Sequence, residues 1–127
     1  MPDTLQALME QVKSVSNPLR MRVLALLNAG ELCVCQVAEC LAVPASSVSE
    51  ALRELRRAGF VTERKEGRWV YVSIVASPSR LLQALLFEAE NLPECRRDRA
   101  RAAEVTGEPI QAICQKHQPT AIEASHV

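Results

Sequence analysis

Short stretches with the periodicity of amphipathic helices, each ended by a proline or a glycine, fill the first 58 residues of the sequence. Leu5, Leu8 and Val12 lie on one helical face, and Asn17-Pro18 provides an N-cap and a first-turn proline for the next helix. The turn residues limit each helix to about two to four turns. Helices are therefore predicted over residues 5–15, 18–27, 33–41 and 45–58.

Two extended runs follow the fourth predicted helix, over residues 60–65 and 68–74. Glu66-Gly67 separates them, and glycine can adopt the positive φ of a tight hairpin turn. After Ser77-Pro78 a further amphipathic helix carries a wide apolar face, which favours self-association with the first helix across a two-fold axis. We expect one domain over residues 1–92, and an extension over 93–127 with a charged helix, a short helical piece and a partly flexible tail after Gln118-Pro119.

Composition limits the class of protein. The chain has 127 residues with 3% aromatic content and zero net charge, which favours one mostly helical domain with an aliphatic core. Residues 1–4 lack the features of a secretory signal, and no apolar run is long enough to span a bilayer. We therefore expect a cytoplasmic protein without a membrane partner. Its five cysteines would then be thiols for metal or redox chemistry rather than disulfides.

The predicted order of a short helix, a turn, a second helix and a basic hairpin is that of a winged helix-turn-helix, a mostly α fold with a β-hairpin wing. In that geometry the helix over residues 45–58 enters the major groove of double-stranded DNA and the hairpin contacts its backbone. Outward-facing polar and basic residues supply the candidate contacts. They are Ser46, Ser47, Ser49, Glu50, Arg53 and Arg57 on the helix, with Arg64, Lys65 and Arg68 on the hairpin.

A pair of thiols, Cys33 and Cys35, lies at the start of the predicted helix 33–41. Thiolates select soft or borderline ions such as Cd(II), Zn(II), Pb(II), As(III) and Sb(III). Residues two apart on an ideal helix differ by about 200° of rotation, so both thiols cannot point at one ion while the helix is intact. We therefore expect ligation to distort the helix start and to be linked to DNA affinity.

Several segments together resemble the ArsR/SmtB family of bacterial metal-sensing repressors, over roughly residues 5–89. They are Leu19-Arg20-Met21-Arg22-Val23-Leu24, Glu31-Leu32-Cys33-Val34-Cys35, Ser47-Val48-Ser49, Gly59-Phe60-Val61 and Arg64-Lys65-Glu66-Gly67-Arg68-Trp69-Val70-Tyr71. The resemblance implies a homodimer that binds an inverted-repeat operator and releases it when a toxic metal or metalloid binds. The thiol string looks most like that of the arsenite sensors. Glu50 and Ala51 depart from the family pattern, where many relatives carry a basic residue or histidine after the serine.

The third ligand is not evident from the sequence. Arsenite-sensing relatives place a cysteine where this chain has Ala38, and cadmium-sensing relatives use N-terminal cysteines that this chain lacks. Cys40 is interpreted as a core residue, about 10 Å along a helix from Cys33. Cys95 is the preferred third thiol, with Cys114 second, from either subunit. His117 and His126 are interpreted as tail residues, and the acidic and histidine spacing of the family's zinc sites is absent from residues 79–92.

The leading hypothesis is a dimeric repressor induced by As(III) or Sb(III). One alternative keeps the fold but makes Cd(II) or Pb(II) the inducer, and another makes the cysteines a redox or persulfide switch. A thiol oxidoreductase is disfavoured because the sequence has no Cys-x-x-Cys on a strand-to-helix turn. We expect a regulator and not an enzyme.

Overall fold

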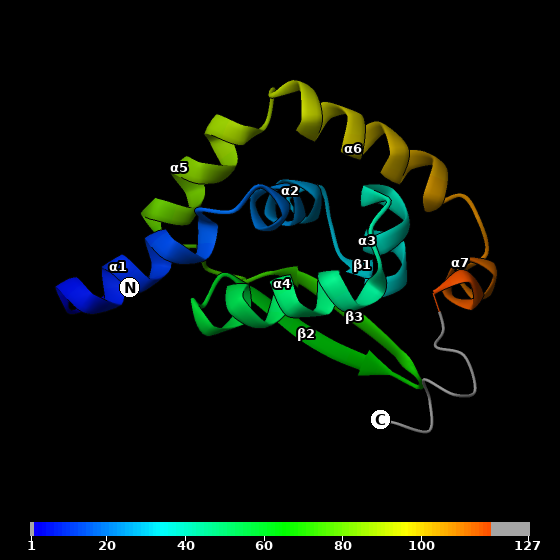
Figure 1. Ribbon diagram of the computed structural model, residues 1–127, viewed down its shortest axis with the longest axis horizontal. Helices are drawn as coiled ribbons and strands as arrows, with labels where there is room; N and C mark the ends of the chain where they lie inside the picture. The colour runs from blue at the N-terminus through cyan, green and yellow to red at the C-terminus, as the bar shows by residue number, and fades with distance from the viewer. Residues whose placement is uncertain (1, 118–127) are drawn as a thin grey trace.

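The computed structural model describes residues 2–117, so the predicted tail and His126 lie outside the described residues. Within this range the chain is mostly helical with one small antiparallel sheet, which confirms the predicted fold class (Figure 1). The elements in chain order are α1 (Leu5–Val15), α2 (Pro18–Leu27), β1 (Leu32–Cys33), α3 (Val34–Leu41), α4 (Ala45–Arg57), β2 (Val61–Glu66), β3 (Trp69–Ile74), α5 (Arg80–Ala89), α6 (Pro93–Val105) and α7 (Ile110–Lys116).

Side-chain caps set where several helices begin. The Thr4 hydroxyl accepts a hydrogen bond from the backbone N–H of Ala7, and the Asn17 amide oxygen accepts one from Arg20. Each bond satisfies a backbone donor that has no partner inside the helix. Helix α3 ends differently, because Ala42 takes a left-handed conformation with φ of 54° and turns the chain toward α4.

The sheet has the strand order β1-β3-β2, with all neighbours antiparallel. Gly67, with φ of 62°, makes the turn of the predicted hairpin between β2 and β3. Strand β1 was not predicted, because two residues are too short to show an alternating pattern. It pairs Leu32 with Val72 and Cys33 with Tyr71, so the thiol segment is hydrogen-bonded to the inner strand of the hairpin.

Helices α5 and α6 arch over α2 and α3, and α7 lies beside α3 at one end of the molecule (Figure 1). Val105 of α6 and Ile113 of α7 are fully buried in the same apolar cluster as Leu24 and Leu55. The helices after residue 92 therefore pack on the core formed by the helices before it. No helix in residues 2–117 is long and apolar enough to cross a membrane.

A bidentate ion pair joins α2 to α6. The Arg22 guanidinium donates two hydrogen bonds of 2.9 Å to the two carboxylate oxygens of Asp98, whose side chain is only 7% exposed. Paired planar groups of this kind combine charge with fixed geometry. Removing the Asp98 charge would leave the partly buried Arg22 guanidinium without compensation.

We predict that Asp98→Asn lowers the free energy of unfolding by about 2 kcal/mol, below the range for fully buried pairs because a third of the Arg22 side chain is exposed. Urea unfolding at one fixed protein concentration measures this change. Glu104→Gln is the matched control, because the Arg101–Glu104 pair lies on the same helix but Glu104 is 70% exposed. Equal effects of the two substitutions on the free energy of unfolding would contradict a special contribution of the Arg22–Asp98 pair to stability.

Candidate thiol site and nucleic-acid interface

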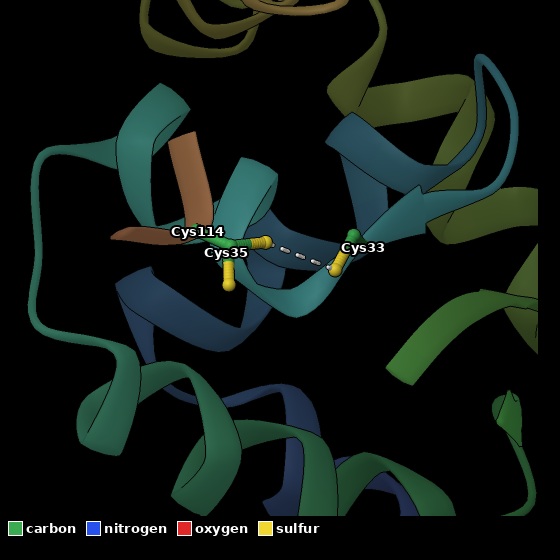
Figure 2. Close-up of side chains that lie close together, drawn as sticks. All are labelled: Cys33, Cys35 and Cys114. Carbon is green, nitrogen blue, oxygen red and sulfur yellow. Dashed lines mark hydrogen bonds between the residues drawn. The ribbon is translucent and has the colours of Figure 1, made fainter. Parts of the chain in front are cut away.

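Three thiols from three elements converge at one place in the fold (Figure 2). Cys33 comes from β1, Cys35 from α3 and Cys114 from α7, and their sulfur atoms all lie within 4.8 Å of one another. The Cys33 and Cys114 sulfurs are 3.9 Å apart. Cys33 and Cys114 are buried, whereas Cys35 is half-buried. The group offers only sulfur ligands, which suits a soft ion or a metalloid.

The backbone of Cys33 explains how two thiols so close in sequence meet. Cys33 is the N-cap of α3, with an extended backbone at φ −73° and ψ 149°, and its N–H donates to the side-chain oxygen of Gln36 over 2.9 Å. The expectation that Cys33 lies inside the helix is therefore wrong, and so is the inference that gathering the two thiols requires a distorted helix. The extended residue turns the Cys33 side chain toward Cys35 while α3 stays intact.

The three thiols lose their protons unequally. A hydrogen bond from the Cys35 thiol lowers the pKa of Cys33 to about 6. The same bond, together with burial, raises the pKa of Cys35, and burial raises the pKa of Cys114. These shifts favour the thiolate on Cys33 over the other two cysteines, because a neighbouring thiol donates to it. A thiolate is the nucleophile and the ligand form of cysteine.

Glu39 of α3 anchors the helix that carries Cys114. Its carboxylate lies 3.0 Å from Nε2 of His117 and 3.7 Å from Nζ of Lys116 at the end of α7, and it accepts a bond of 3.1 Å from Arg101 of α6. The contact with His117 lowers the pKa of Glu39. Sequence reasoning missed this role, because Glu39 is an ordinary charged residue in the pattern and its partners lie far along the chain. His117, interpreted as a tail residue, instead contacts α3.

The other two cysteines lie apart from this group. Cys40 is buried in the main core, and burial raises its pKa to about 11. Cys95 is buried in a small separate cluster with Ala25 and Ala89. Within one chain the structure thus brings Cys114 to the Cys33–Cys35 pair, and it does not bring Cys95, the thiol preferred from the sequence. The assignment of each thiol as a ligand stays a prediction.

A cavity of about 700 Å³ adjoins the thiols. Cys33, Cys35 and Cys114 all line it. The cavity extends between α4 and the β2–β3 hairpin, where Trp69 and Val70 form part of its wall. The site is therefore accessible from the face that carries the candidate DNA contacts.

The candidate DNA contacts on α4 lie mostly on its outer face. Val48, Leu52 and Leu55 are buried, while the opposite side of the helix is exposed, as its spacing predicted. Ser47 is half-buried, and Arg57 donates to Glu54 over 3.4 Å. The exposed candidates on α4 are Ser46, Ser49, Glu50, Arg53 and Arg57.

The hairpin candidates are exposed, but they differ in their partners. Arg64 is paired with Glu31 at 2.7 Å and with Glu66 at 3.1 Å, and its guanidinium carbon lies 4.5 Å from the centre of the Tyr71 ring. Arg68 lies over the Trp69 ring at 4.7 Å. Lys65 lies between them on an exposed stretch of β2. Arg64 therefore links the residue before β1 to the hairpin, in addition to being a candidate phosphate contact.

The helix-turn-helix part of the chain is similar to known proteins. Residues 17–63 match the family described as "Bacterial regulatory protein, arsR family". The chain is 39% identical over 72 residues to the transcriptional repressor SmtB homolog of Synechocystis, a match that covers 57% of this chain and 54% of that protein. It is also 34% identical over 85 residues to the putative arsenical resistance operon repressor ArsR2 of Halobacterium salinarum. This match covers 65% of this chain and 71% of that protein.

A solved structure titled as a possible transcriptional regulator for arsenical resistance is also similar. It superposes with a TM-score of 0.51 at 32% identity, covering 72% of this chain and 94% of the other. The match confirms the predicted fold, and the relatives are regulators and not enzymes. The chain belongs to the ArsR/SmtB family of helix-turn-helix transcriptional regulators.

Proposed function

We propose that the protein is a homodimeric repressor that binds operator DNA and releases it when As(III) or Sb(III) binds the thiolates of Cys33, Cys35 and Cys114. The convergence of three sulfur atoms within 4.8 Å carries the proposal. Trivalent arsenic and antimony form three bonds to thiolate sulfur, so the number and type of ligands fit. Zinc sites ordinarily have four ligands, and the described residues offer three in this group.

Linkage between the thiols and DNA binding rests on β1. Cys33 is paired with Tyr71 of β3, and Glu31, two residues earlier, holds Arg64 of β2. Cys35 lies in the first turn of α3, which precedes the candidate DNA helix α4 across the Ala42 turn. A ligand that draws Cys33, Cys35 and Cys114 together would act on the hairpin and the helix pair at once. A difference of about 2 to 3 kcal/mol between the two states weakens operator binding by tens to a hundredfold.

Two alternatives use the same fold. Cd(II) or Pb(II) would use the same sulfur ligands. A peroxide-sensitive switch is favoured by one further observation, the 3.9 Å separation of Cys33 and Cys114 beside the lowered pKa of Cys33. Peroxide would oxidise the Cys33 thiolate to a sulfenic acid with loss of hydroxide, and the Cys114 thiol would then displace water to form a disulfide.

We expect arsenite to release the wild-type protein from its operator and to protect three thiols per bound ion. Cys33→Ser, Cys35→Ser and Cys114→Ser should each weaken the response at least about tenfold, because each removes one of three bonds. Fluorescence anisotropy of labelled operator DNA, first isolated from a random-sequence pool, measures the release. Cys40→Ser and Cys95→Ser are matched controls that should respond like wild type.

The results of this series test both the three-thiol assignment and the identity of the inducer. Unchanged release in Cys114→Ser, or a loss in Cys95→Ser, would overturn the three-thiol assignment. Release by peroxide or by Cd(II) or Pb(II), with no response to arsenite, would replace the proposed inducer by the corresponding alternative.

We predict that Arg53→Ala lowers operator affinity and reduces the slope of log affinity against log salt by about one, because an exposed guanidinium that contacts phosphate displaces about one counterion. Arg97→Ala is the control, an exposed arginine on α6, on the arch away from α4 and the hairpin (Figure 1). Affinities over a range of salt concentrations measure the slope. An equal loss in both variants would contradict a specific role for α4.

The proposed dimer would use exposed apolar residues at the end of the molecule where α1 and α5 lie (Figure 1). Leu5 is 75% exposed and Phe87 is 74% exposed, with further exposed apolar side chains at Leu8, Met9, Val12 and Leu92. A contact between subunits would remove these apolar side chains from water.

We predict that Met9→Glu combined with Phe87→Glu converts the protein to a monomer, because the contact would bury two charges without partners. Sedimentation equilibrium gives the mass in solution. Ala103→Glu adds a charge at an exposed position on α6 and should leave the mass unchanged. A double variant with the wild-type mass would place the subunit contact elsewhere.

A further inference from the structure

The cavity beside the thiols is much larger than a single metalloid ion needs. The three sulfur atoms lie within 4.8 Å of one another, so an ion bonded to all three would occupy the space between them. The adjoining cavity of about 700 Å³ would remain open. Volumes of about 300 to 1,000 Å³ are typical of sites for small organic molecules. The space beyond the sulfurs is therefore large enough for an organic group attached to the bound atom.

The walls of the cavity include several apolar side chains. Val34 lies between the two clustered cysteines in sequence, and Leu52 of α4 and Val70 of β3 contribute further aliphatic surface. Trp69 adds a half-buried aromatic ring, whose face is held by the Arg68 guanidinium at 4.7 Å. A flat apolar group would gain by leaving water for this environment, and an aromatic ring would gain a second contribution from contact with the indole.

We propose that the thiol site takes monosubstituted trivalent arsenicals, R–As(OH)₂, in which R is an aromatic ring held in this cavity. The inference rests on the proposed function, because it assigns the class of ligand for the same thiols. Two As–O bonds break and two As–S bonds form. The Cys35 thiol proton and one proton from the medium leave with the two hydroxyl groups as two molecules of water, and arsenic keeps its oxidation state. The carbon substituent takes one of the three bonds of arsenic, so two thiolates complete its coordination.

The number of thiols required separates this ligand from arsenite. Arsenite, As(OH)₃, exchanges three hydroxyl groups for three thiolates, whereas the substituted compound needs two. Cys33 and Cys35 lie side by side on β1 and the first turn of α3, so they can hold the substituted arsenical without Cys114. Loss of Cys114 should thus weaken arsenite binding and leave the aromatic compound bound.

A ligand in this cavity would also lie close to candidate DNA contacts. Ser46, Ser49 and Arg53 also line this cavity, and they are candidate DNA contacts on α4. A ring that fills the space between α4 and the hairpin would approach these side chains directly. We expect a bulky substituent to oppose operator binding more strongly than arsenite does at equal occupancy.

The test compares phenylarsine oxide, which hydrates to the phenyl compound, with methylarsonous acid and arsenite, on the dimeric full chain without DNA. Trp69, the only tryptophan of the sequence, reports occupancy by its fluorescence, and equilibrium dialysis with arsenic quantification gives Kd. The phenyl compound should bind about tenfold more tightly than the methyl compound and protect two thiols. In Cys114→Ser it should keep its affinity, while arsenite loses at least about tenfold.

Val70→Phe narrows the cavity and should reduce the preference for phenyl over methyl about tenfold. Thr62→Phe adds the same ring to the same hairpin at an exposed position that does not line the cavity, and should keep the preference. Should Val70→Phe fail to fold by circular dichroism, Trp69→Ala removes the aromatic wall and should lower the phenyl preference in dialysis. An unchanged preference in the folded cavity variant would overturn the inference.

The two proposals fail in different ways. Operator release by arsenite without any preference for the phenyl compound would leave the proposed function standing and remove this inference. A phenyl preference that depends on Val70, in a protein whose operator binding no arsenical changes, would keep the cavity assignment and remove the proposed function.

Discussion

The pairing of β1 with β3 joins the two parts of the molecule on which the proposed switch depends. Only Leu32 and Cys33 take part, yet they attach the segment before α3 to the inner strand of the hairpin. The pairing holds Cys33 extended, which lets its sulfur approach Cys35 at the start of an intact helix. It also places Glu31 where it can bind Arg64. One short ladder thus sets the geometry of the thiols and their connection to the hairpin.

Most of the fold could be predicted from local patterns, whereas the site could not be completed from them. Helical spacing, Asn17-Pro18 and the Glu66-Gly67 turn each act over a few residues, and the structure has the corresponding elements. Strand β1 was missed because its two residues are defined by a partner strand about 40 residues away. The approach of Cys114 to Cys33 likewise depends on how α7 packs, a long-range result that spacing does not encode.

Both apolar packing and ion pairs hold α7 in its position. Ile113 is fully buried in the core, and Glu39 accepts contacts from Lys116 and His117 at the helix end. Glu39 also binds Arg101, so one partly buried carboxylate connects α3, α6 and α7. A short helix near the end of the chain would be poorly held by its own backbone bonds. Its contacts with α3 are what bring the third sulfur near the other two.

Of the three thiols proposed to bind the inducer, only Cys114 lies outside the part of the chain that carries the candidate DNA residues. The candidate DNA residues all lie before residue 70, while the third sulfur belongs to a helix that starts at residue 110. During synthesis the helix-turn-helix and hairpin emerge from the ribosome well before the thiol group can assemble. A mutation that shortens the chain before α7 would, on the proposed assignment, remove the third arsenite ligand while every candidate DNA residue remains.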